Sequence, residues 1–213
     1  MKAIQLLLLI IFVCSYSASS AQISSADDWN TDRLEREHKA MRVLMIWGST
    51  NLGLGVVGTF TSKEEDVQWF SSVNAGFGAV NLALGWIGVN RTQKQLKSLP
   101  SLDAGYRDLR KTRNILLVNA GLDVGYIVTG ILVRDEVFRG FGYRRINLGP
   151  ASQRGFGSSL ILQGAALLIF DSVTAWSLSK SEIHISPVLT PNGAGLGFQS
   201  DFSKKQPQGV AWF

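Results

Sequence analysis

Four apolar segments follow one another along the chain, at residues 41–60, 67–89, 113–133 and 156–178. Each has about 20 residues, which is the length that an α-helix needs to cross the hydrocarbon core of a membrane. None has the charged face that a soluble amphipathic helix shows. The pattern predicts an all-α membrane domain over residues 41–180, a four-helix transmembrane bundle of two related helical hairpins. A water-soluble bundle with a very hydrophobic core is the alternative.

The first two segments carry the same motif, and the second copy follows the first after thirty residues. In residues 47–58 and 77–88, a helix would place the first Gly, the Asn and the last two Gly on one stripe, because they are three or four residues apart. Small residues allow transmembrane helices to approach closely, and an amide among them can form a hydrogen bond across the interface. We therefore predict helix packing through these stripes and through the equivalent glycine of the third segment. The predicted packing residues are Gly48, Gly55, Gly58, Gly78, Gly85, Gly88 and Gly130.

Each apolar segment also carries an Asn or an Asp near its middle, and these side chains are expected to form a polar layer across the bundle. The layer is predicted to contain Asn51, Asn74, Asn81, Asn119, Asp123, Gln163 and Asp171. An ionised carboxyl at the centre of a bilayer costs about 2.5–3.5 kcal/mol on insertion scales, so an Asp there is a candidate functional residue. One hypothesis is structural, with protonated or hydrogen-bonded side chains that hold the helices in register. The other is a proton or cation site, with the two Asp as carriers and the amides as ligands.

The two ends of the chain have a different character. Residues 1–21 combine a positive start, a short apolar core and small residues before a cleavage site, which predicts a secretory signal peptide. Residues 22–40 are expected to be a solvated polar lead-in, with His38 on its surface and a helical Glu35–Lys39 pair. Turn residues between two weakly alternating stretches predict an extended C-terminal tail, with a short β-hairpin, over residues 181–213.

Composition excludes several classes of function. Charged residues make up 17% of the chain, below the roughly 25% of soluble proteins. The basic residues, which give a pI near 9.5, stand between the apolar segments, as is typical of membrane-flanking positions, and form no nucleic-acid-binding motif. Cys14 is the only cysteine, and the two histidines have no metal-ligand spacing. Since no nucleophile elbow or nucleotide-binding motif is present either, we predict no enzyme activity, no cofactor, no metal and no nucleic-acid partner.

Three stretches carry a resemblance to a known family. They are the Asn119–Tyr126 stretch NAGLDVGY, the Arg154–Asp171 stretch that begins RGFG, and the Phe70–Asn81 stretch FSSVNAGFGAVN. The chain resembles a family of small, uncharacterised bacterial proteins with a signal peptide and four hydrophobic helices, over most of residues 40–190. The resemblance implies this fold and an exported compartment, and it implies no activity. Taken alone, the RGFG motif is expected to be a surface turn.

Two signals disagree about membrane topology. A cleaved signal peptide leaves residue 22 on the exported side, which puts most Lys and Arg residues outside, whereas cytoplasmic segments normally carry the positive excess. We give more weight to the signal peptide and predict a cell-envelope membrane, with inner and outer membrane left open.

The sequence leaves three functions open. The first is a structural or interaction component of the envelope, in contact with membrane lipid and with copies of itself or other envelope proteins. The second is a proton, cation or small-solute transporter or channel-like element that uses Asp123 and Asp171. The third is a bundle that binds a lipid or another small ligand.

Overall fold

The computed structural model describes residues 26–135, 149–181, 183–190 and 193–200 of the chain. In this part of the chain the elements are α2 (Ala26–Thr61), α3 (Glu65–Lys97), α4 (Leu102–Arg134), α5 (Pro150–Ser179), β1 (Ile183–Thr190) and β2 (Gly193–Ser200). The predicted signal peptide and the last part of the predicted tail lie outside the described residues.

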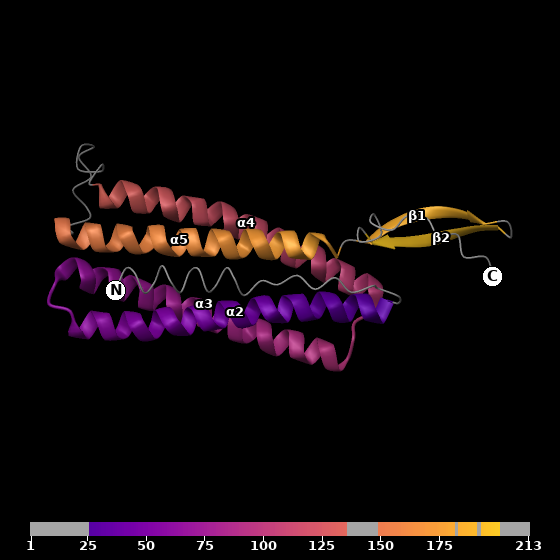
Figure 1. The fold of residues 1–213 in the computed structure, drawn as a ribbon, viewed down its shortest axis with the longest axis horizontal. Helices are drawn as coiled ribbons and strands as arrows, with labels where there is room; N and C mark the ends of the chain where they lie inside the picture. The colour runs from indigo at the N-terminus through magenta and orange to yellow at the C-terminus, as the bar shows by residue number, and fades with distance from the viewer. Residues whose placement is uncertain (1–25, 136–148, 182, 191–192, 201–213) are drawn as a thin grey trace, which may run out of the picture.

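The helices form two antiparallel hairpins (Figure 1). Helix α2 packs along α3, helix α4 packs along α5, and the hairpins meet chiefly where α3 lies against α5. Among the described residues, four helices are long and apolar enough to cross a membrane. The prediction of an all-α four-helix bundle with membrane-length apolar segments is therefore confirmed.

The helices are longer than the apolar segments that predict them. The shortest, α5, has 30 residues and the longest, α2, has 36. At a rise of about 1.5 Å per residue they measure roughly 45–54 Å, whereas a hydrocarbon core is about 30 Å thick. Helix α3 continues to Lys97 and α4 begins at Leu102, so most of the stretch between the second and third apolar segments is helical. The helices therefore extend beyond the apolar segments at the end of the bundle where α2 begins.

Local sequence explains where several helices begin. The Ser101 side chain accepts a hydrogen bond from the backbone N–H of Ala104 and caps the start of α4. Pro150 occupies the first turn of α5, where the missing N–H would have no partner inside the helix. Helix α3 has Glu65 and Asp66 in its first turn and Lys97 in its last, which complements the helix dipole.

Large apolar side chains cover the outside of the apolar stretches of the helices. Phe60 is 84% exposed, Val118 is 65% exposed and Trp86 is 61% exposed. Soluble monomers rarely expose contiguous apolar patches of more than a few hundred Å². This surface favours a membrane environment over the water-soluble alternative.

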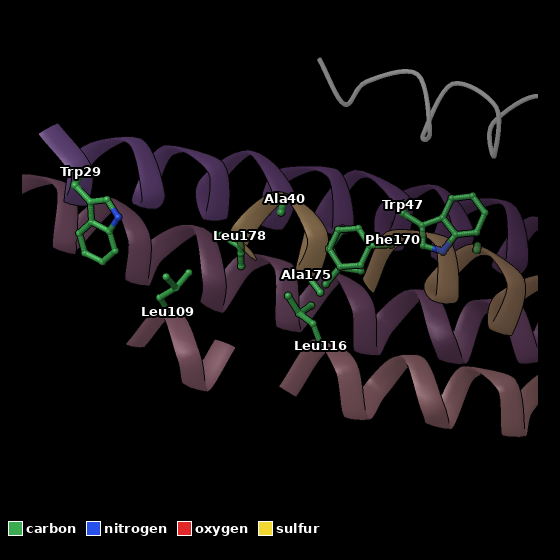
Figure 2. Packing of buried hydrophobic residues seen from close by; sticks show 10 residues of the cluster. Trp29, Ala40, Trp47, Leu109, Leu116, Phe170, Ala175 and Leu178 are labelled. Atoms are coloured by element: carbon green, nitrogen blue, oxygen red, sulfur yellow. The ribbon is translucent and has the colours of Figure 1, made fainter. Parts of the chain in front are cut away.

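Buried hydrophobic side chains form a row along the inside of the bundle, from Trp29 near the start of α2 to Trp47 in its middle (Figure 2). Helix α4 contributes Leu109 and Leu116, and α5 contributes Phe170 and others. The row runs through both the charged and the apolar part of α2. The interior therefore extends beyond the apolar segments.

The expectation of a solvated lead-in before residue 41 is wrong for its central part. Helix α2 begins at Ala26, and Arg33 and Glu37 are buried and paired with each other at 2.7 Å. The physical reason is long-range packing, since the start of α2 lies against the start of α4 and the end of α5. Glu35 and Lys39, by contrast, are helical and exposed, as expected of a solvated stretch.

His38, expected on the surface, is half-buried, and its Nδ1 lies 2.8 Å from the Thr92 hydroxyl of α3.

After α5, strands β1 and β2 pair antiparallel, with Ile183 opposite Ser200 and Thr190 opposite Gly193. A two-stranded hairpin is marginally stable by itself.

Candidate functional site

Helices α2 and α3 are in backbone contact at Gly48 and Gly78. A Cβ atom added at Gly48 would lie 2.8 Å from the carbonyl oxygen of Gly78, and a Cβ added at Gly78 would lie 2.8 Å from the carbonyl oxygen of Gly48. Each glycine also lies against the Asn–Leu backbone of the other copy of the motif. Real Cβ atoms essentially never come within 3.0 Å of such an atom, so any larger residue at either position would push the helices apart.

The same reciprocity continues along the hairpin. Gly55 packs on the backbone of Ala75, and Gly85, thirty residues after Gly55, packs on the backbone of Met45, thirty residues before Ala75. The two copies of the repeated motif are therefore related by a local two-fold axis between α2 and α3. Gly58 is buried, while Gly88 lies against the flexible side chain of Met41.

Helices α4 and α5 of the second hairpin also pack on each other through glycines. A Cβ added at Gly130 would lie 2.7 Å from the carbonyl oxygen of Gly157, and one added at Gly164 would lie 2.7 Å from the carbonyl oxygen of Asp123. Gly155 of α5 packs on the backbone of α3, because a Cβ added at Gly155 would lie 3.0 Å from the amide nitrogen of Phe70.

Sequence reasoning missed Gly155, Gly157 and Gly164. The RGFG motif at residues 154–157, expected to be a turn, is helical and belongs to α5. The available signal was the seven-residue spacing of Gly157 and Gly164, which places them on one helix face.

Gln163 of α5 is the centre of a buried amide cluster. Its Nε2 donates to Asn51 Oδ1 of α2 at 2.8 Å and to Asn74 Oδ1 of α3 at 2.5 Å. Its Oε1 accepts a hydrogen bond from Trp47 Nε1 at 3.3 Å. The Asn side chains in turn donate to carbonyl oxygens of their own helices, Asn51 to Trp47 and Asn74 to Phe70, both at 2.8 Å. One side chain thus ties α5 to both helices of the first hairpin.

Asp123 of α4 and Asp171 of α5 form a second buried group. Their residues are 2% and 5% exposed, and the carboxyl groups lie within hydrogen-bonding reach of each other. Among the described residues, Asp123 Oδ2 has no hydrogen-bond partner. Each ionised Asp at the centre of a bilayer would cost about 2.5–3.5 kcal/mol on insertion scales, so two adjacent charges without a counter-charge are strongly disfavoured.

The structure places the remaining two layer residues separately. Asn81 is 4% exposed and its backbone lies against Gly48, while its Nδ2 has no hydrogen-bond partner among the described residues. Asn119 is half-buried on α4. Within the described part of the chain, no hydrogen bond links the amide cluster with the carboxyl pair. The expected single layer is therefore divided into the amide cluster, the carboxyl pair and two separate Asn side chains.

A third polar group lies at the end of the bundle where α2 begins. Arg33 Nη2 donates to Asn30 Oδ1 at 3.3 Å, and the Arg33 guanidinium stands 5.6 Å from the ring centroid of Trp29. Asn30 Nδ2 donates to the carbonyl oxygen of Pro100 at 3.0 Å, and Trp29 Nε1 donates to that of Ser181 at 2.6 Å. Two side chains of α2, Asn30 and Trp29, thus connect the start of this helix with the α3–α4 turn and the end of α5, and Arg33 contacts both of them.

Two carboxyl groups near this end have opposite pKa shifts. Burial raises the pKa of Glu37 above its usual value, although the Arg33 guanidinium opposes the effect. Partial burial of Asp108 acts in the same direction, but the Gln95 amide and the Arg91 guanidinium, 2.9 Å away, outweigh it and hold the pKa of Asp108 below its usual value. Charged groups of α2, α3 and α4 therefore interact here.

None of these groups has the composition of a metal site. In residues 26–135 and 149–181 there is no cluster of three His, Cys, Asp or Glu side chains that could hold a metal ion. The expectation that the chain is not an enzyme remains a prediction.

Residues 43–172 match the model of a family described as "Family of unknown function (DUF6992)". Because this match covers more than half of the chain, the chain belongs to that family, and its resemblance to an uncharacterised family is confirmed. A comparison with curated proteins finds no match, and neither does a comparison with solved structures. The matched region contains the glycine repeat, the amide cluster and both buried Asp residues, but not Arg33 or Glu37.

Proposed function

We propose that this member of a family of unknown function is an integral membrane protein of the cell envelope with a structural or interaction role. The observation that carries the proposal is the hydrogen bonding of Gln163 to Asn51 and Asn74. Its two amide hydrogens and its oxygen are used in joining three helices, which is the arrangement expected of a polar group that holds a bundle together.

The outer surface supports membrane lipid as a partner of the bundle. The apolar side chains in the middle of the helices face outward, and the Lys180 ammonium lies 3.5 Å from the ring centroid of Trp176, which is 61% exposed. Aromatic and basic side chains at the end of an apolar helix are typical of the membrane–water interface. The N-terminal signal pattern supports export, and copies of the chain or other envelope proteins are the proposed protein partners.

Isolation of the tagged full chain from its native membrane tests the role. We expect detergent-dependent extraction, and we expect envelope proteins or further copies of the chain to be recovered with it. Loss of these partners in Gln163→Leu, with a matched yield of the membrane-inserted variant, would support a role that depends on bundle packing. A chain that is released by high salt alone would contradict the proposal.

Transport is the second candidate, because the carboxyl pair of Asp123 and Asp171 lies inside an apolar region. The two roles differ in proteoliposomes. The structural role predicts no proton flux and no difference between the wild type and Asp123→Asn or Asp171→Asn. A flux that both substitutions abolish, with folding intact, would favour transport.

A further inference from the structure

The contact between α4 and α5 brings the carboxyl groups of Asp123 and Asp171 together. The α4 backbone at Asp123 touches α5 at Gly164, seven residues before Asp171, since a Cβ added at Gly164 would lie 2.7 Å from the carbonyl oxygen of Asp123. Both residues are buried, with Asp123 2% exposed and Asp171 5% exposed. The two carboxyl groups therefore lie in the interior of the α4–α5 hairpin.

Two ionised carboxyl groups cannot form a hydrogen bond with each other, because both are acceptors only. The side chains of Asp123 and Asp171 are nevertheless within hydrogen-bonding reach. Such a contact is favourable when one of the two groups carries a proton and donates it to the other. An acid and a carboxylate in this arrangement share one hydrogen bond that is assisted by charge.

Along α4 and α5, the basic side chains nearest to the two carboxyl groups are Arg113, ten residues before Asp123, and Lys180, nine residues after Asp171. The stretches 43–62, 67–90, 114–133 and 155–179 contain no Lys, Arg or His. Their titratable side chains are the two Asp and Tyr126, whose ring packs edge-on against Phe77 of α3 with centroids 5.4 Å apart. In the described part of the chain, Asp123 Oδ2 is also buried without a hydrogen-bond partner. The pair thus has acceptors available and lacks a donor.

We propose that Asp123 and Asp171 form a proton-binding site between α4 and α5, in which the two carboxyl groups share one proton. The ligand is a proton rather than a metal cation, because the described residues place only two carboxyl groups here and no third acidic or histidine ligand. This site goes beyond the proposed structural role, and it is present whether or not the chain transports anything.

Infrared difference spectroscopy of the full chain in lipid nanodiscs at neutral pH tests the proposal. We expect the wild type to show the C=O band of a protonated carboxyl group, with a shift on exchange into D₂O. In Asp171→Asn and in Asp123→Asn, the new amide can donate to the remaining carboxylate in place of the proton. The band should therefore be lost in each single variant and in the double variant, while gel filtration and circular dichroism show an intact helical protein.

Asp103→Asn is the matched control, because Asp103 lies outside the apolar stretches in an exposed ion pair with Arg107, and it should leave the band unchanged. If a variant does not fold, ¹³C labelling of the Asp carboxyl carbons assigns the wild-type band without any substitution. A wild-type spectrum with ionised Asp only, or a band that persists undiminished in the double variant, would overturn the proposal. A band that disappears when Na⁺ or K⁺ is added at constant pH would assign the site to a metal cation and would also overturn it.

Discussion

Gly48 of α2 and Gly78 of α3 have equivalent surroundings. A Cβ added at either glycine would lie 2.8 Å from the carbonyl oxygen of the other. The two residues come from copies of one motif that are thirty residues apart. Two copies of a helical stripe can pack against each other in antiparallel orientation with two-fold symmetry. The repeat in the sequence and the axis in the structure are therefore the same feature.

Substitution of Gly48 or Gly78 by Val is predicted to separate α2 from α3. The atoms that a Cβ would meet belong to backbone, which cannot move aside alone. Overpacking of a core typically costs about 1–3 kcal/mol, and backbone contacts place these substitutions at the upper end. A thermal unfolding midpoint in detergent, followed by circular dichroism, measures the effect.

The same two helices offer matched controls for this experiment. Gly53 of α2 and Gly76 of α3 are exposed, and a Cβ added at either one meets nothing within 4 Å. Gly53→Val and Gly76→Val should therefore leave the midpoint close to that of the wild type. Equal losses in both pairs of variants would show that helix propensity, and not packing, controls stability here.

Gln163→Leu is predicted to destabilise the bundle by removing the donor to two buried amide oxygens. A buried polar group that loses its partner costs about 1–3 kcal/mol, although hydrogen bonds in membranes average only about 0.6 kcal/mol. We expect a loss within this range, with weakened association between α5 and the first hairpin. The unfolding midpoint and limited proteolysis of the α3–α4 turn measure the two effects.

The triple variant Gln163→Leu, Asn51→Leu and Asn74→Leu separates two explanations for that loss. Since it removes the unpaired partners as well, it should recover part of the stability that Gln163→Leu loses. If the triple variant loses as much stability as the three single variants lose in sum, the three amides contribute independently and not as one hydrogen-bonded cluster.

The raised pKa of Glu37 predicts a loss of stability with rising pH. Folding favours the protonated form, because the pKa in the folded state exceeds the 4.5 of the free group. The contribution of Glu37 is therefore complete below pH 4.5 and is lost as the pH rises through the folded-state pKa. Glu37→Gln should show a flatter decline of the unfolding midpoint in this range. A parallel decline in both proteins would contradict the burial argument.

Asp108 should behave in the opposite way. Its pKa lies below the 3.8 of the free group, so its contribution is present above pH 3.8 and is lost as the pH falls through the folded-state value. Asp108→Asn is expected to lower the midpoint at neutral pH and to have little effect in strong acid. The effect should be small and weakened by salt, because the pair with Arg91 is partly exposed.

Trp29→Phe is predicted to lower the free energy of unfolding by about 0.5–1.5 kcal/mol, through loss of the hydrogen bond from Nε1 to the Ser181 carbonyl oxygen. The ring remains large enough to keep most of the packing at a site that is 1% exposed. Trp176→Phe, at an exposed position, is the control and should change the midpoint little. If the control loses as much stability, the effect reflects the substitution of Trp in general.

Length, hydrophobicity and the repeated motif were sufficient to predict the helical bundle and its hairpins. A period of three and four residues shows which side of a helix carries small residues, and Gly48, Gly55, Gly78 and Gly85 do face the partner helix. The same logic could not show which polar groups meet. The bonds from Gln163 to Asn51 and Asn74 depend on the relative register of α3 and α5, which local sequence does not encode.

The charged start of α2 shows a different limit. A stretch rich in Asp, Glu, Lys and Arg is normally solvated, and that average fails for Arg33 and Glu37, which are buried. In the same part of α2, Trp29 bonds to Ser181 after α5 and Asn30 bonds to Pro100 before α4. These neighbours are up to 152 residues away in the sequence, as for Trp29 and Ser181. Only tertiary structure identifies this buried pair.

The central claim is that the glycine and amide faces meet inside the bundle while the apolar faces contact lipid. Spin labels at Val80→Cys, Leu84→Cys and Val118→Cys, in a Cys14→Ser background in lipid bilayers, test it most directly through collision rates with oxygen and with a water-soluble nickel chelate. The account predicts frequent collisions with oxygen, which concentrates in lipid, and few with the chelate at all three sites. Frequent collisions with the chelate at these sites would show that water surrounds the helices and would contradict the account.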